Sequence, residues 1–358
     1  MNVEIITTRN ESFKETGFGT LKACASVFDA IKRVGHEVRL NTCQTSADLD
    51  EIVGRKPDLV ILAIKYLAIP GTDDIWLSEY FAARDINFTG SSRDVLKFDS
   101  DKVLAKNFLR GQGIRTANHF TAIPGQYSGD ADLPIAFPLF LKPSDSANGN
   151  GIDDLSFVTN FAEFESKVLS LHGAFGVPVL AEEYLDGPEY TVAVIKPLQG
   201  DLLVSSIEIV PMQSGNGLRI LGEKAKQDDS EELKKADNSV IANRVKQLAI
   251  DVFVALGIRD FGRIDIKTNA NRLCFFMEAN LVPGMTLGTS YFPRACEIDH
   301  GLDYDDVVAL MLEEGFGRAL SKYNELGVVI PTAAGLGRDL RFAALAKDQS
   351  PSSVRSYN

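Results

Sequence analysis

Cysteine and histidine are scarce in this chain, and neither occurs at a spacing typical of a metal site. There are four of each in 358 residues. The cysteines form no CxxC pair, and the histidines form no HExxH-type group; the cysteines are Cys24, Cys43, Cys274 and Cys296. Buried thiols in a reducing compartment are therefore expected, rather than disulfides or a zinc site.

Positive charge and long apolar runs are also in short supply. The 37 Lys and Arg residues are outnumbered by 49 Asp and Glu residues, which gives a net charge of -12. Nucleic acids and anionic membrane surfaces attract basic proteins, so neither partner is expected. No apolar run approaches the roughly 18 residues of a membrane span, and no basic and apolar signal sequence opens the chain. A cytoplasmic protein is predicted.

The remaining composition is that of a soluble globular protein, with 45% hydrophobic and 24% charged residues. The length predicts two or three domains. Strands are expected at 2–8, 37–41, 58–64 and 86–89, with helices at 19–34 and 75–84, a pattern typical of a parallel sheet covered by helices. A Rossmann nucleotide site requires a glycine-rich turn after the first strand, which TTRNES lacks. The nucleotide-binding part is therefore expected later in the chain.

Farther along, strands are expected at 137–142, 177–185 and 202–210, with helices from 101, at 230–256 and at 304–314. The last segment, AKDQSPSSVRSYN, is expected to be frayed. No internal repeat is visible.

The most informative stretch is 261–293, which alternates like two strands of a hairpin. Arg263 and Asp265 are two residues apart and share one face of the first strand. In the second strand Leu273, Phe275 and Met277 are expected to pack on one face, while Glu278 and Asn280 emerge at its end. The oxygen-bearing side chains Asp265, Glu278 and Asn280 predict a site for Mg²⁺, with Mn²⁺ as the alternative, and for a phosphorylated ligand. The other interpretation is that these residues are the solvated ends of an ordinary hairpin.

The motifs GRIDI and MEANLVPGMT resemble the catalytic core of ATP-grasp ligases, in particular the D-alanine–D-alanine ligase branch. The resemblance covers about 101–293 well and the N-terminal third in part, through GTDDIWLSEYFAARDINFTGS. It implies a three-domain α/β ATP-grasp fold. The expected parts are an N-terminal parallel-sheet domain (1–95), a small central domain (96–183), a C-terminal antiparallel-sheet domain with the metal site (184–318), and a partly disordered extension (319–358).

The resemblance also implies roles for individual residues. Lys102 and Lys142 are expected to contact ATP phosphates, and the loop 144–152 to cover them. The expected nucleoside contacts are Glu182, the main chain from Glu183 to Leu185, and Glu189, which accepts from the ribose. A mobile loop at 211–227 is expected to carry a phosphate-contacting lysine, Lys224 or Lys226. Arg263 is expected to face the transferring phosphoryl group, Gly284 to let the main chain approach the substrate, and Ser290 to hold a substrate carboxylate.

The implied chemistry is ATP-dependent amide formation through an acyl phosphate, with release of ADP and phosphate. The expected partners are small-molecule carboxylate and amine substrates, without nucleic acid or membrane, and with a homodimer as an open option. Several family features are missing: the N-terminal Ser-x-Glu, the His-Gly pair, where the chain has IKYLAIP, and a serine at Asn148. One residue is also inserted before Ser290. The sequence therefore favours substrates other than a D-alanine pair. The alternatives are a D-alanine–D-alanine ligase of peptidoglycan synthesis and a non-catalytic nucleotide-binding protein.

Overall fold

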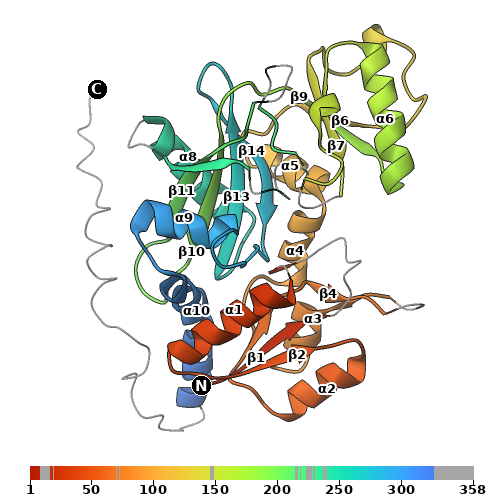
Figure 1. The fold of residues 1–358 in the computed structure, drawn as a ribbon. Coiled ribbons are helices and arrows are strands. Elements are labelled where there is room, and N and C mark those ends of the chain that lie inside the picture. Colours follow the sequence, from red (N-terminus) through yellow and green to blue (C-terminus); the bar gives the residue numbers. More distant parts are fainter. Residues whose placement is uncertain are drawn as a thin grey trace.

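The N-terminal part of the computed structural model is a small parallel sheet. The structure describes residues 1–8, 17–18, 20–69, 71, 73–145, 149–213, 217, 219–222, 228, 230–236 and 240–325. Strands β1 (Asn2–Thr7), β2 (Glu37–Thr42) and β3 (Leu59–Leu62) pair in the order β2-β1-β3. Helices α1 (Leu21–Arg33) and α2 (Ser46–Gly54) connect them (Figure 1). The predicted parallel α/β opening is thus confirmed.

The rest of this region differs from the prediction in detail. The expected helix at 75–84 is split into the short strand β5 (Ile75–Trp76), which pairs with β4 (Tyr66–Leu67), and the helix α3 (Leu77–Ala82). The expected strand at 86–89 makes a single parallel bridge, between Phe88 and Val60. Two further helices, α4 (Arg93–Ser100) and α5 (Lys102–Gly111), lead out of this region.

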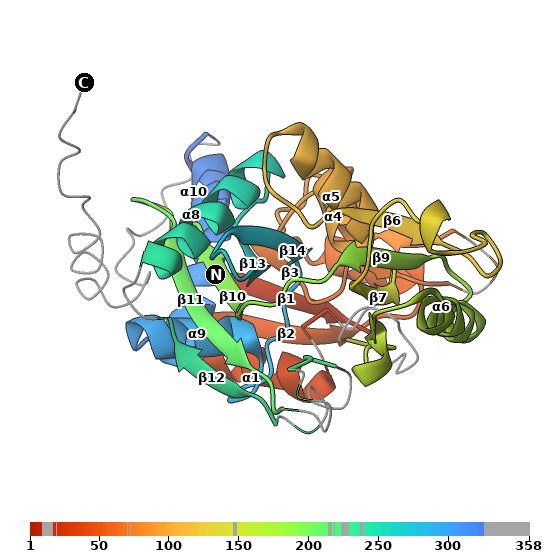
Figure 2. The same cartoon turned by 90° about the horizontal axis from the view of Figure 1, so that it is seen from above.

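A four-stranded sheet follows, in the order β6-β9-β7-β8. Its strands are β6 (His119–Ala122), β7 (Leu139–Pro143), β8 (Phe157–Val158) and β9 (Val179–Glu183). Helix α6 (Phe161–Phe175) covers one face, where Phe164, Val168 and Leu171 are buried against the strands. This group lies to one side of the molecule, at the upper right of Figure 1 and the right of Figure 2.

The largest sheet has five strands in the order β12-β11-β10-β13-β14, all antiparallel. Its strands are β10 (Glu189–Ile195), β11 (Leu203–Val210), β12 (Glu232–Lys235), β13 (Phe261–Thr268) and β14 (Cys274–Asn280). Alternation along β10 separates two cores. Val192 and Val194 pack with helix α8 (Val240–Ala255), whereas Ala193 and Ile195 pack with helix α9 (Tyr291–His300).

The prediction of one helix over 230–256 is wrong at its beginning. Residues 232–235 form β12, which pairs antiparallel with β11, and the described helix begins at Val240. A short, charged and largely exposed strand is a common way to end a sheet, because it offers little to a further strand. Neighbouring strand pairing therefore overrode the local helical pattern.

Helix α10 (Tyr304–Glu325) is longer than the predicted helix at 304–314. Its buried residues Val308, Met311 and Leu312 share one core with α1, α9 and the N-terminal sheet. The segment 326–358, predicted to be frayed, lies outside the described residues. Within the described part of the chain, no helix is both long and apolar enough to span a bilayer.

Candidate active site

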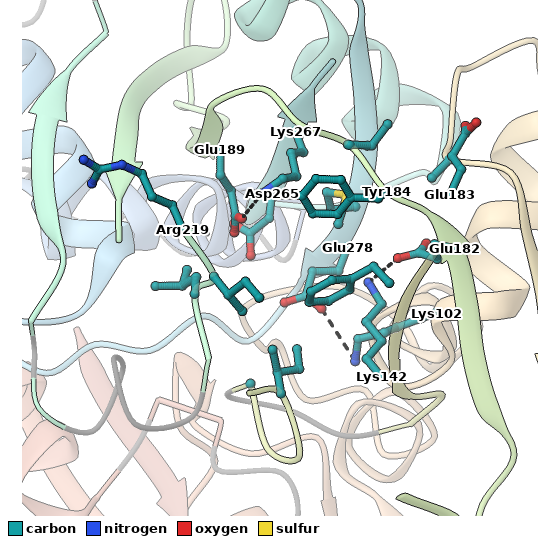
Figure 3. Close-up of a pocket in the computed structure, with 18 residues that line it drawn as sticks. Lys102, Lys142, Glu182, Glu183, Tyr184, Glu189, Arg219, Asp265, Lys267 and Glu278 are labelled. Carbon is teal, nitrogen blue, oxygen red and sulfur yellow. Dashed lines mark hydrogen bonds and ion pairs between the residues drawn. The ribbon is translucent and has the colours of Figure 1, made fainter. Parts of the chain in front are cut away.

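A pocket lies between the four-stranded sheet and the end of the β13–β14 hairpin (Figure 3). Charged and apolar side chains both line it, a combination typical of sites for small molecules. Eight residues predicted from the sequence line it: Lys102, Lys142, Glu182, Glu183, Leu185, Glu189, Asp265 and Glu278. The fold therefore brings together residues that are up to 176 positions apart, from Lys102 to Glu278.

Lys142 ends β7 at the pocket wall and is held by a buried carboxylate. Its Nζ lies 2.7 Å from Glu182 Oε2, and the other oxygen of Glu182 lies 2.6 Å from Lys106 Nζ. Burial raises the pKa of Glu182, but the two ammonium groups more than offset this and hold it at about 2. Burial lowers the pKa of Lys142, and Glu182 more than compensates, so the net direction is upward. Both side chains are therefore charged at neutral pH.

Lys106 was not predicted from the sequence. It lies one helical turn after Lys102 in α5, is fully buried, and donates to the carbonyl oxygen of Phe276 at 3.2 Å. Burial lowers its pKa to about 8 in spite of the attraction of Glu182. The i, i+4 spacing from Lys102 was the available signal, since residues four apart share a helix face.

The predicted metal ligands occupy the end of the hairpin, and a bulge decides which way they face. Asp265 pairs with Glu278, but the next pair is Ile266 with Phe276, so Met277 is the extra residue. A bulge of this kind redirects the side chains on one side of it. It puts Glu278 on the same face as Asp265 while Phe276 stays in the core. Phe275 and Met277 do pack together, with Ala117 and Leu185. The prediction is wrong in that Leu273 is exposed and Met277 lines the pocket beside Glu278, because it assumed unbroken alternation.

Asp265 is the centre of a hydrogen-bonded cluster. Its Oδ1 accepts from the hydroxyl of Thr191 at 2.6 Å and from Arg263 Nε at 3.1 Å. Its Oδ2 accepts from Arg263 Nη2 at 3.0 Å and from Asn280 Nδ2 at 3.2 Å. Burial raises the pKa of Asp265, Arg263 opposes that shift, and Glu278 adds to it. The carboxylates of Asp265 and Glu278 thus face each other across adjacent strands, and Arg263 neutralises their negative charge only in part.

These residues fit a hard divalent cation. Oxygen donors of this kind are the ligands that Mg²⁺ prefers, and like charges on directly opposite strand positions are unfavourable unless a cation neutralises them. Lys102 Nζ is 3.6 Å from Glu278 and supplies part of that neutralisation. Within the described ranges no group of three His, Cys, Asp or Glu side chains converges. The predicted metal ligands are two carboxylates and the side-chain amide of Asn280, so the site does not require three His, Cys, Asp or Glu side chains.

The other end of the pocket has apolar walls and one ion pair. Glu189 Oε2 lies 3.2 Å from Lys267 Nζ, and both side chains line the pocket. Lys267 was missed, although it follows Arg263 and Asp265 at strand spacing and so had to share their face. The Tyr184 ring packs edge-to-face on Phe157 with centroids 4.6 Å apart. Apolar contact area here comes from Phe140, Ile152, Leu185, Ile220, Leu221 and Met277.

Within 183–185 the expected main-chain contacts are already partly used. The amide of Glu183 donates to the Asn118 carbonyl at 2.9 Å, and that of Tyr184 to the Pro138 carbonyl at 3.1 Å. The Glu183 carboxylate accepts from the amide and the side chain of Asn118. It therefore lies at the pocket rim, as Figure 3 shows, pointing away from the lysines.

Two loops meet over the pocket. Arg219, Ile220 and Leu221 line it from one side, and Gly149 and Ile152 from another. A Cβ atom on Gly222 would lie 2.5 Å from the carbonyl oxygen of Ile152, so only glycine allows this approach. The predicted lysines Lys224 and Lys226, and Asn148, lie outside the described residues.

The remaining predicted residues lie beside the pocket and not among its lining. Arg263 and Asn280 contact it through Asp265. Ser290 Oγ accepts from the Thr286 amide at 2.8 Å, and a Cβ atom on Gly284 would lie 2.9 Å from the same oxygen. Gly284 and Ser290 thus close one tight turn that leads into α9.

Comparison with known proteins shows the family of the chain. A family model described as D-ala D-ala ligase C-terminus matches residues 116–313, more than half of the chain. The D-alanine--D-alanine ligase of Marinomonas sp. (strain MWYL1) is 28% identical over 232 residues, covering 64% of this chain and 70% of that protein. The D-alanine--D-alanine ligase of Aquifex aeolicus (strain VF5) is 24% identical over 323 residues, covering 87% of this chain and 100% of that protein.

Two solved structures share the fold. The D-alanine--D-alanine ligase from Bacillus anthracis complexed with ATP has a TM-score of 0.68 at 20% identity, covering 90% of this chain and 99% of that one. The VanG D-Ala:D-Ser ligase from Enterococcus faecalis has a TM-score of 0.65 at 18% identity, covering 87% and 98%. The predicted ATP-grasp fold is confirmed. The chain belongs to the D-alanine–D-alanine ligase family, and it is an ATP-dependent ligase that forms carbon–nitrogen bonds.

Proposed function

We propose that this enzyme joins two molecules of D-alanine at the expense of ATP. The observation that carries the reaction type is the placement of Lys102 and Lys142 opposite Asp265 and Glu278 in one pocket, which suits a phosphate chain with a divalent cation. The choice of D-alanine rests on the names of the relatives. They favour this alternative over the other substrates that the sequence suggested.

The bond to be made explains why ATP is consumed. A carboxylate oxygen is too poor a leaving group for an amine to displace. Attack of the first substrate's carboxylate on the γ-phosphate of ATP forms an acyl phosphate and releases ADP. The amino group of the second substrate then attacks the acyl carbon, phosphate leaves, and the nitrogen loses a proton to give the amide.

The protein's contribution is positioning and charge. Lys102 and Lys142 are proposed to neutralise phosphate oxygens, with Lys224 or Lys226 as a further contact. Arg263, oriented by both oxygens of Asp265, is proposed to stabilise the transferring phosphoryl group and the later oxyanion. Bound Mg²⁺ at Asp265, Glu278 and Asn280 would draw electron density from the phosphate oxygens.

The nucleoside is proposed to lie on the apolar side of the pocket. The main chain at Leu185 faces the adenine edge, since the amides of Glu183 and Tyr184 already have carbonyl partners. Glu189 accepts from the ribose hydroxyls while Lys267 holds its carboxylate in place. The Glu182 side chain acts through Lys142 and not through the nucleoside, because both of its oxygens pair with lysines.

A second candidate is a ligase with a different amine substrate, favoured by the residues next to Ser290. The hydroxyl of Tyr291 is hydrogen-bonded to Glu231 Oε1, and the Tyr291 ring lies 5.6 Å from the Arg263 guanidinium. The second oxygen of Glu231 is buried and has no hydrogen-bond partner among the described residues. An ammonium group brought close to this oxygen would be stabilised. The pair therefore suits an amine substrate that carries a further cationic group, because the amino group that attacks the acyl carbon must itself be uncharged and D-alanine has no other.

The test is ADP release with D-alanine alone, and with D-alanine paired with D-serine or L-alanine. Robust ADP formation with D-alanine alone, accompanied by the dipeptide in mass spectrometry, is the expected result. No ADP formation above the level without amino acid, together with turnover for another pair, would replace D-alanine by that pair.

A further inference from the structure

Lys106 is a fully buried lysine that the reaction described above does not use. It projects from the same helix face as Lys102, but the two side chains serve different carboxylates. Lys102 reaches Glu278 at 3.6 Å, whereas Lys106 reaches Glu182 at 2.6 Å. Burying an ammonium group costs several kcal/mol unless it is well paired, so a lysine kept at 0% exposure beside the pocket calls for an explanation.

The charges of the three buried side chains Lys106, Glu182 and Lys142 explain why Lys106 is kept there. Glu182 is 1% exposed and ionised, and its two oxygens pair with one lysine each. If Lys142 were the sole partner of Glu182, the two charges would cancel, and a phosphate would meet a neutral pair. With Lys106 on the other oxygen, the three groups together carry one positive charge. That charge appears at Lys142, because Lys142 lines the pocket and Lys106 does not.

We propose that Lys106 is a positioning residue for nucleotide binding, which neutralises Glu182 so that Lys142 presents a net positive charge to the phosphates. This inference rests on the proposed binding of ATP in the pocket. It assigns Lys106 no contact with the nucleotide. Lys106 acts through Glu182, on the neighbouring strand β9, and through Lys142 on β7.

The same side chain ties the two walls of the pocket together. Lys106 Nζ donates to the carbonyl of Phe276 in β14, 170 positions away in the sequence and two residues before Glu278. Its second partner, Glu182, belongs to the four-stranded sheet. One ammonium group thus connects α5, the strand that carries Glu278, and the strand beside Lys142. A role in packing alone would not require Lys106 to be charged, whereas the proposed role towards the phosphates does.

The two roles are separated by a pair of variants. In Lys106→Met the apolar stem is kept and the charge is lost, so Glu182 cancels Lys142. In the double variant Lys106→Met/Glu182→Gln the carboxylate charge is lost as well, and Lys142 again carries a net positive charge. Lys246→Met is the matched control, because it removes a lysine paired with Asp299 at 2.7 Å, between α8 and α9 and away from the pocket.

The measurement is the Kd of a non-hydrolysable ATP analogue with Mg²⁺ by calorimetry, beside thermal melting of each variant. The Kd is expected to rise at least about tenfold in Lys106→Met, the scale of one lost charge-assisted contact. It should return to within about threefold of the wild-type value in the double variant, and stay unchanged in Lys246→Met. A single variant within twofold of wild type, or a double variant that binds no better than the single one, overturns the charge role.

The wild-type protein provides a test that needs no folded variant. The charged groups around Lys106 are Glu182, Lys142 and Glu278, and His119 also feels its charge. Since the pKa of Lys106 is lowered to about 8, the analogue should bind more weakly at pH 9.5 than at pH 7.5. A Kd that does not change over this range contradicts the proposal.

These outcomes differ from failure of the proposed function. A wild-type protein that binds no analogue would remove the ATP site itself. A wild-type protein that binds the analogue but releases no ADP with D-alanine would change the substrate and leave the comparison of the Lys106 variants intact.

Discussion

The buried carboxylate of Glu182 should make the stability of this protein steep in acid. The pKa of Glu182 is about 2 in the folded protein, because Lys106 and Lys142 outweigh the effect of burial, against an ordinary value of 4.5. A folded-state pKa below the unfolded value means that the folded state binds fewer protons. The stabilising contribution is therefore complete above about pH 4.5 and is lost as the pH falls through 2.

The size of the effect follows from the shift. A difference of about 2.5 units, at about 1.36 kcal/mol per unit, amounts to about 3 kcal/mol in total. Roughly 2 kcal/mol of it should be lost between pH 4.5 and pH 3. The carboxylate is 1% exposed, so solvent screening reduces this value little.

The assay is urea unfolding at pH 6 and pH 3 of the wild type and of Lys106→Met/Glu182→Gln, which lacks both the carboxylate and its first lysine. The free energy of unfolding of the wild type should fall by about 2 kcal/mol more than that of the double variant. Glu183→Gln, which removes a half-buried carboxylate that pairs with no lysine among the described residues and lies one residue along the same strand, is the control. Parallel losses of stability in the wild type and the double variant would refute the argument.

Three further predictions concern the pocket and the segments beside it. Asp265→Asn and Glu278→Gln should each remove most of the turnover at saturating MgATP while the melting temperature stays near that of the wild type; normal turnover in both would exclude them as metal ligands. Gly187→Ala should destabilise the protein by about 1–3 kcal/mol, because the new Cβ atom would lie 2.7 Å from the Thr268 carbonyl oxygen; an unchanged melting temperature would contradict the close approach of these two segments. Residues 219–222 should exchange amide hydrogen more slowly once the ATP analogue and substrate are bound, as expected for a segment that excludes water; equal exchange in both states would make it a fixed wall.

The hairpin shows how far a local pattern carries. Period-two spacing was enough to place Arg263 and Asp265 on one face, and the register confirms that Asp265 pairs with Glu278. The same rule failed between Met277 and Glu278, since a bulge inserts one residue there. Whether a bulge forms depends on how the partner strand pairs and on which side chains fit the core beneath, and the alternating pattern of one strand does not predict it.

The helix expected over 230–256 failed for a related reason. Helical periodicity is real from Val240 onward, where Val245, Ala249 and Val252 are buried on one face. The charged residues before it satisfy a helix and a sheet edge about equally well. Residues 232–235 form a strand and not a helix because the main-chain groups at the edge of β11 gain hydrogen bonds by pairing with β12.

The sequence by itself determined the parallel α/β opening, the antiparallel hairpin, the family, and most of the charged residues that line the pocket, because these depend on short-range periodicity and on contiguous motifs. The tertiary structure alone decided how their charges combine. The sequence singled out Lys102 in α5 and gave no reason to single out Lys106. In the structure Lys106 pairs with Glu182, 76 positions later in the chain. It thereby sets the net charge that Lys142 presents to the pocket. Electrostatic energy depends on distance in space and on burial, and separation along the chain specifies neither.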